Sequence, residues 1–297
     1  MEYRGNIYRP PVEASTFLLP ITEGCTHNSC SFCNMYQDIP FRMWTLAEVE
    51  QYLQEVVRLY GRSCERIERV YLVGADPFAL SANNLLDRIS LIRKYLPNAA
   101  TITMYARTDN IGSKSDDDLA ALKEAGVNDL YIGVECELND VLEQHNKGYS
   151  ADDTREQCMR LNVAGFRHCD LLMLGMAGKG RGLECARTTA ALENEIKPDK
   201  ILINTMSAFV GTQLDEDIRT GAFIPAAEKE NLEEERELLA GLELPDCYFW
   251  AVHPLDSVKI EGILGDKKQQ MLETLSWSIE HVKEDAISRT AESELFK

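Results

Sequence analysis

The sequence contains no apolar run that approaches the ~20 residues needed to span a bilayer. Met1–Glu13 also lacks the apolar segment of a secretory leader. The mean hydropathy of −0.27 agrees with a water-soluble chain, so we expect a cytoplasmic protein without a membrane partner. Because that compartment is reducing, the nine cysteines are not expected to form a disulfide framework.

Basic residues are scarce relative to acidic ones. The chain has 31 Lys and Arg against 49 Asp and Glu, which gives a net charge of −18. Nucleic-acid binding relies on Lys and Arg that neutralise backbone phosphates. We therefore expect no nucleic-acid partner. A chain with this negative net charge could contact a phosphate backbone only through a local basic channel.

Internal repeats and low-complexity segments are missing as well, and short β-branched or apolar runs instead alternate with amphipathic stretches of helical spacing. The predicted strands are Phe17–Thr22, Arg69–Gly74, Thr101–Arg107, Asp129–Glu135, Asp170–Gly175 and Lys200–Met206. The predicted helices are Leu46–Leu59, Asn83–Tyr95, Ser115–Ala125, Ala151–Ala164 and Leu183–Glu195. This alternation predicts an α/β fold with a parallel sheet, which six units can close partly or wholly into a barrel. An open doubly wound sheet is disfavoured because no Gly-x-Gly-x-x-Gly follows a predicted strand.

The pattern changes after Met206, so we expect residues 1–208 to form a core and residues 209–297 an extension packed on it. The Glu-rich segment Ala227–Gly241 is typical of a helix with a solvated acidic face. The apolar run Cys247–Val252 is predicted to cover an open edge of the sheet, and a helix is predicted from Lys267 to about Glu284.

Three of the cysteines lie close together just after the first predicted strand, namely Cys25, Cys30 and Cys33. Soft thiolates at this spacing select zinc or an iron–sulfur cluster. A structural zinc site needs four ligands, and the chain has no second cysteine pair, so His27 would have to bend back inside its own loop. We favour a [4Fe–4S] cluster with one iron open to a ligand, over zinc and over three structural thiols.

The pattern Cys25-x4-Cys30-x2-Cys33, with the aromatic Phe32 before the last cysteine, resembles the cluster loop of the radical S-adenosylmethionine (SAM) superfamily. The commonest spacing there is x3 and x2, so this chain has one extra residue in the first gap. The resemblance extends over Thr16–Leu244 and best matches the branch of the oxygen-independent coproporphyrinogen oxidases. It implies a partial (β/α)6 TIM-like barrel of the radical SAM type, followed by a C-terminal extension of helices and strands.

Further segments carry the resemblance. Val73–Pro77 resembles the Gly-Gly-Glu-Pro motif that binds the SAM amino group, with Ala75 in place of the second Gly and Asp76 in place of Glu. Ile132–Glu135, followed by Asn146–Gly148, resembles the fourth-strand signature, which often reaches the ribose, and Asn204–Met206 falls where the adenine usually rests. The resemblance implies that SAM is bound by Phe32, Tyr36, Gly74, Asp76, Arg107, Glu135 and Thr205.

The strand ends support these placements independently of the family. In a parallel barrel, the carboxyl ends of the strands meet at one rim, where functional sites collect. Gly74, Arg107, Glu135 and Thr205 all fall at predicted strand ends. Arg107 could form a fork to a carboxylate ligand, although a local pair with Asp109 is the alternative.

The resemblance implies an oxidoreductase-type radical SAM enzyme with two cofactors, a [4Fe–4S] cluster and SAM. It also implies an electron donor such as flavodoxin or ferredoxin. We expect a small-molecule substrate, because the chain is acidic and has no further cysteine cluster for auxiliary iron–sulfur centres. The alternatives are a non-catalytic cluster- or haem-binding relative and a tRNA- or peptide-modifying enzyme. No residue identifies the substrate or a catalytic proton or hydrogen donor.

Overall fold

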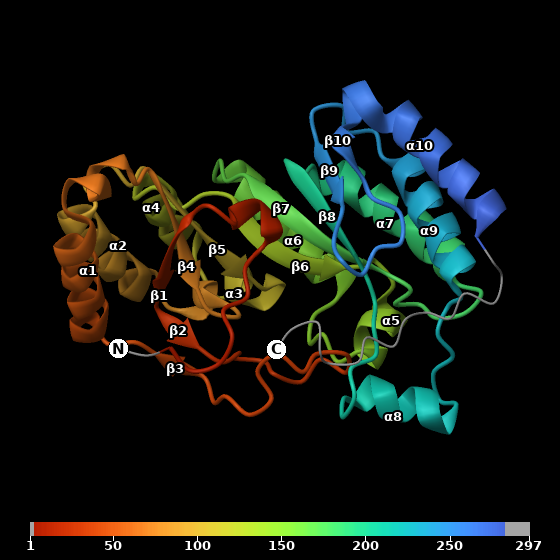
Figure 1. Ribbon diagram of the computed structural model, residues 1–297, viewed down its shortest axis with the longest axis horizontal. Helices are drawn as coiled ribbons and strands as arrows, with labels where there is room; N and C mark the ends of the chain where they lie inside the picture. Colours follow the sequence, from red (N-terminus) through yellow and green to blue (C-terminus); the bar gives the residue numbers. More distant parts are fainter. Residues whose placement is uncertain (1–2, 283–297) are drawn as a thin grey trace. The chain divides into compact units, whose positions relative to one another are not determined.

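The computed structural model describes residues 3–282, which divide into two compact units. Within the described range, the first unit consists of residues 3–28, 35–133 and 157–168. The second unit consists of residues 29–34, 134–156 and 169–282. These units interleave along the chain, so the expected division at residue 208 stays a prediction. Figure 1 follows the chain from red to blue.

Parallel strands form the centre of the first unit. They are β1 (Phe17–Pro20), β4 (Arg69–Val73), β5 (Thr101–Ala106) and the start of β6 (Leu130–Glu135). β1 pairs with β4, β4 with β5, and β5 with β6, each in parallel register. Val70–Val73 is fully buried, as expected for a parallel strand covered on both faces. A short hairpin of β2 (Thr22–Glu23) and β3 (Arg42–Met43) follows β1.

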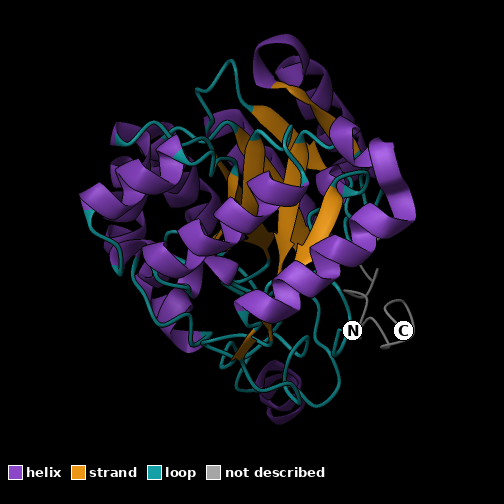
Figure 2. Cartoon of the chain, turned by 90° about the vertical axis from the view of Figure 1, so that its left-hand side faces the viewer, coloured by secondary structure: helices purple, strands orange, loops and turns teal. Residues whose placement is uncertain are grey.

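Helices follow the strands of this unit and lie beside them in Figures 1 and 2. They are α1 (Leu46–Tyr60), α2 (Ala82–Tyr95), α3 (Thr108–Gly112) and α4 (Asp116–Glu124), with the 3-10 turns η1 (Pro11–Glu13), η2 (Gly61–Arg66) and η3 (Pro77–Ala79). α1 starts at a capping box in which Thr45 and Glu48 satisfy each other's backbone amides. α6 (Ala151–Val163) begins in the second unit and ends in the first.

The second unit contains a second set of strands. They are β7 (His168–Leu174), whose first residue belongs to the first unit, β8 (Lys200–Thr205), β9 (Tyr248–Ala251) and β10 (Ile260–Ile263). β8 pairs in parallel with β7 and β9, and β10 is antiparallel to β9. The predicted run Cys247–Val252 thus covers the edge of β8. The helices of this unit are α5 (Asn139–Gln144), α7 (Gly182–Ile196), α8 (Gln213–Thr220), α9 (Glu228–Gly241) and α10 (Leu264–His281).

The prediction that the Glu-rich segment presents a solvated face is wrong for part of the helix, although Glu233 and Glu237 are partly exposed. α9 packs against both α7 and α10, and this places acidic side chains inside the second unit. Glu234 and Glu235 are 2% and 1% exposed. The acidic run also contains leucines such as Leu238 and Leu239, which are buried on the side of α9 that faces the core. Neighbouring glutamates are buried together with these leucines.

The α/β class and its succession of strand–helix units are confirmed. Each predicted strand and helix is present, with ends within a few residues of the expected ones. The predicted helical end near Glu284 lies outside the described residues. Within residues 3–282, none of the helices is both long and apolar enough to span a membrane.

Candidate functional site

The three clustered cysteines differ from the others in exposure. Cys25, Cys30 and Cys33 are free thiols that are partly exposed, whereas the other six cysteines are buried. Cys33 donates its backbone amide to the Cys30 carbonyl over 3.1 Å, which folds the end of the loop into a tight turn. The donor set of three accessible thiols fits an iron–sulfur cluster with one open iron.

In the first unit, Asp76 lies against the beginning of the cysteine loop. It is fully buried and accepts hydrogen bonds from the backbone amide of Thr26, at 3.3 Å, and from the Thr26 hydroxyl. Burial raises the pKa of the Asp76 carboxyl, although the bonds from Thr26 and the charge of Arg107 oppose this. Burial and the Asp76 carboxylate also raise the pKa of the Cys25 thiol. A buried acid beside a partly exposed thiol favours a positively charged ligand group here.

Gly74 directly follows β4 and has a φ of +154°. A Cβ added there would collide with the Thr22 hydroxyl and lie 3.1 Å from Cγ of Pro77. Only glycine therefore fits this turn, which leads directly to Asp76.

Two other predicted residues of the first unit are engaged locally. The Arg107 guanidinium bonds Asp109, with Nε 3.0 Å from Oδ1, which is the alternative that the sequence left open. The Tyr36 ring is buried and packs edge-on against Tyr8, with ring centroids 5.5 Å apart. The Tyr36 carbonyl accepts a 3.0 Å hydrogen bond from the Asn28 side chain and so supports the cysteine loop.

In the second unit, Glu135 and Phe32 are brought together by Lys147, which lies in the signature segment Asn146–Gly148 but was not predicted to contact SAM. Lys147 Nζ lies 2.8 Å from Glu135 Oε1, and both side chains are buried. The same ammonium group lies 5.7 Å from the Phe32 ring centroid and 5.4 Å from that of Tyr149. Burial alone would lower the pKa of Lys147, but Glu135 and its other neighbours hold it well above its usual range.

The backbone of Glu135 is strained. Its φ is +66°, a left-handed conformation that non-glycine residues rarely adopt. Such strain persists only where the surroundings hold it, and it concentrates at functional sites. The strained end of β6 therefore supports the prediction that Glu135 faces a ligand.

Thr205 ends β8 and donates its hydroxyl to Asp256 Oδ1 over 3.1 Å. Asp256 is buried in the extension and also accepts the His253 amide at 3.0 Å. Burial raises the pKa of Asp256 to about 6. The extension thus contacts the residue that the resemblance places near the adenine.

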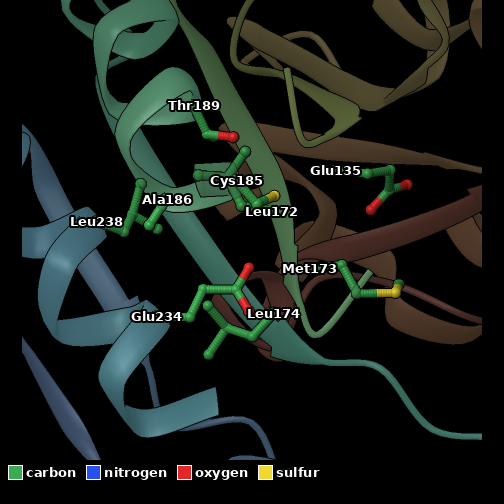
Figure 3. A pocket seen from close by; sticks show the side chains of 9 residues that line it. All are labelled: Glu135, Leu172, Met173, Leu174, Cys185, Ala186, Thr189, Glu234 and Leu238. Atoms are coloured by element: carbon green, nitrogen blue, oxygen red, sulfur yellow. The ribbon is translucent and has the colours of Figure 1, made fainter. Parts of the chain in front are cut away.

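A small cavity lies beside the end of β7, between that strand and helices α7 and α9. Figure 3 shows Glu234 beside Leu174, with Glu135 and Met173 on the other side of the strand. The cavity measures ≈ 10 Å³, about enough for the centre of one water molecule. It cannot hold a substrate. Glu234 accepts the Gly175 backbone amide at 2.9 Å, so it anchors the start of the loop after β7, in which Gly175, Gly178 and Gly180 lie.

Glu234 is expected to make stability depend on pH. Burial raises its pKa from 4.5 to about 7, so folding favours the protonated acid. The stabilisation of the folded protein by protonated Glu234 is complete below pH 4.5 and is lost as the pH rises through 7. Glu234→Gln keeps the acceptor for Gly175 and should stabilise the protein at pH 8 by up to about 3 kcal/mol relative to its parent.

Urea denaturation at pH 5 and pH 8 measures this effect. Glu233→Gln removes one negative charge from the same helix and is the matched control. If the Glu234→Gln variant follows the pH dependence of the parent, Glu234 is not the group responsible.

The parallel α/β fold and the loop of three accessible thiols are the features expected of a metal-binding α/β protein. More particularly, the chain belongs to the radical SAM superfamily, whose family model matches residues 19–182, more than half of the chain. This match confirms the predicted superfamily, the class of enzyme and the two cofactors that characterise the class.

The individual proteins that this chain resembles are only distantly similar to it in sequence. The chain is 25% identical over 250 residues to a tRNA uridine(34) acetyltransferase of Methanocaldococcus jannaschii, covering 71% of this chain and 46% of the relative. It is 28% identical over 137 residues to the haem chaperone HemW of Bacillus subtilis, covering 44% of this chain and 36% of that protein. The chain thus spans less than half the length of these curated relatives.

Among solved structures, the coproporphyrinogen III oxidase HemN of Escherichia coli has the same fold. It superposes with a TM-score of 0.55 at 17% identity, covering 76% of this chain and 51% of that protein. At this identity the likeness establishes the fold alone.

Proposed function

We propose that this protein is a radical SAM enzyme that acts on a small molecule, with Cys25, Cys30 and Cys33 as ligands of a [4Fe–4S] cluster. The observation that carries the proposal is the contrast between these three accessible thiols and the six buried ones. When bound, the reduced cluster and SAM supply a 5′-deoxyadenosyl radical that removes a hydrogen atom from the substrate.

The chain's own residues would bind and orient SAM. Gly74 leaves room for close approach at the end of β4, and the buried Asp76 carboxylate suits the methionine ammonium group. Glu135, held by Lys147, suits the ribose hydroxyls. Phe32 lies within the cysteine loop and Tyr36 follows it. Thr205 would lie near the adenine, and Arg107 would face a carboxylate if it released Asp109.

Anaerobic reconstitution with iron and sulfide, followed by reduction in the presence of SAM, tests the activity. We expect 5′-deoxyadenosine and methionine to be released. A fully loaded cluster that yields no 5′-deoxyadenosine would contradict the proposal and favour a non-catalytic binder. Flavodoxin and ferredoxin can be compared with a chemical reductant in the same assay.

A tRNA substrate is the second candidate, because the similarity to the tRNA uridine(34) acetyltransferase extends over 250 residues. The net charge of −18 opposes it, since backbone binding needs clustered Lys and Arg. Excess tRNA that raised 5′-deoxyadenosine formation in a salt-dependent manner would favour this second function.

Two substitutions of Asp76 distinguish a contact with SAM from a structural role in the cysteine loop. Asp76→Asn keeps an acceptor for Thr26 but removes the charge, so SAM affinity should fall by roughly 10-fold or more while iron content is retained. Asp76→Ala should in addition release Thr26, which adjoins Cys25. Equilibrium dialysis with SAM and iron analysis measure the two effects.

The exposed Asp38, substituted in the same way, controls for loss of one negative charge near the loop. Unchanged SAM affinity in the Asp76→Asn variant would remove this carboxylate from the binding site.

A further inference from the structure

Ser31 lies between Cys30 and Cys33, and each of its polar atoms takes part in a hydrogen bond. Its backbone amide donates to the His145 carbonyl over 3.1 Å, and its hydroxyl lies 2.7 Å from His145 Nδ1. Its own carbonyl accepts the Leu214 amide at 2.9 Å. Ser31 is buried, although Cys30 and Cys33 are partly exposed. The loop is therefore fixed at Ser31, while the neighbouring thiols stay accessible.

The hydrogen bonds of His145 assign its ring protons. Nε2 lies 2.9 Å from the Met176 carbonyl, which can only accept, so Nε2 carries a hydrogen. The ring is 1% exposed, and burial lowers the pKa of His145, which keeps the imidazole neutral. Nδ1 is then an acceptor, and the Ser31 hydroxyl donates to it. Both ring nitrogens and the backbone carbonyl of His145 are therefore used.

The ring of His145 also packs against two phenylalanines. It meets Phe32 and Phe223 edge-on, with centroid distances of 5.9 Å and 5.5 Å. Phe32 belongs to the cysteine loop, and Phe223 follows α8 in the extension. His145 thus joins the cysteine loop, the loop after β7 and the extension at one point within the second unit.

We infer that His145 is a positioning residue for the cluster-binding loop, because its ring and carbonyl fix Ser31 and thereby the placement of the Cys30 and Cys33 thiols. This inference rests on the proposed function, since it concerns the same cluster. A histidine that only filled the core would need neither the tautomer that accepts from Ser31 nor a backbone bond to the same residue.

Three variants test the inference. His145→Ala removes both ring bonds, Ser31→Ala removes only the hydroxyl, and His145→Asn keeps an acceptor near the position of Nδ1. Loss of one neutral hydrogen bond should raise the population of an opened loop roughly fivefold. Oxygen should therefore bleach the cluster roughly fivefold faster in Ser31→Ala than in the parent. The increase should be larger in His145→Ala, which loses two ring hydrogen bonds and the ring packing, and His145→Asn should lie between His145→Ala and the parent.

The electron paramagnetic resonance spectrum of the reduced cluster is the second measurement. It should change in both alanine variants and return toward the parental form in His145→Asn. Leu275→Ala, which removes a buried side chain of α10, controls for a general loss of stability. Parental bleaching rates and spectra in both alanine variants would overturn the inference.

Hydrogen exchange of the metal-free protein separates this inference from the proposed function. The Ser31 amide should exchange faster in His145→Ala than in the parent. If the parent binds no iron, the proposed function fails while the exchange experiment still tests the anchoring of the loop. Unchanged exchange at Ser31 would refute the anchoring whether or not iron binds.

Discussion

Replacing Cys25, Cys30 and Cys33 together with alanine is expected to abolish iron binding. The anaerobically reconstituted parent should hold about four irons per chain, and the variant none. Its visible absorption and its 5′-deoxyadenosine formation should be lost with the iron. The loss should be complete because these three thiols are the accessible ones among the nine cysteines.

A matched variant shows whether the effect belongs to this loop. Cys64, Cys158 and Cys247 are buried and lie far apart in the sequence, and replacing all three with alanine removes the same number of thiols. That variant should keep its iron and lose only stability. Stoichiometric zinc without iron in the anaerobic parent, or iron retained by the loop variant, would contradict the assignment.

The fold was largely predictable because its strands are continuous apolar runs. The predicted strand Arg69–Gly74 corresponds to β4 at Arg69–Val73, and the predicted helix Leu46–Leu59 corresponds to α1 at Leu46–Tyr60. The strands β2 and β3 escaped prediction, since a strand of two residues is too short to show a period. The short helices α5 and α8 also escaped prediction.

The candidate site was predictable only in its motifs. The cysteine spacing and the acidic residue after Gly74 could be recognised in the sequence, but the bond from Thr26 to Asp76 depends on how the loop returns to β4. His145 carries no sequence signal, because its role arises from loops that meet in space. The burial of Glu234 could not be read from a run of glutamates, because it depends on the helices that enclose α9.

The second prediction with a large expected effect is the loss of stability when the ion pair of Lys147 and Glu135 is broken. Its charges lie 2.8 Å apart with 6% and 10% of the side chains exposed, so neither is well solvated. Lys147→Met removes the cation, fits the aromatic surroundings of Phe32 and Tyr149, and leaves a buried carboxylate without its partner. Breaking a buried pair from one side typically costs about 3–5 kcal/mol.

We therefore expect Lys147→Met to lower the urea midpoint of the metal-free protein strongly at pH 7. Measuring the metal-free form keeps the result independent of the cluster. The double variant Lys147→Met/Glu135→Gln should recover most of the lost stability, since it leaves no uncompensated charge. It should not recover SAM binding if Glu135 contacts the ribose. Equal destabilisation in the single and double variants would show that the packing of Lys147, rather than its charge, stabilises the strained end of β6.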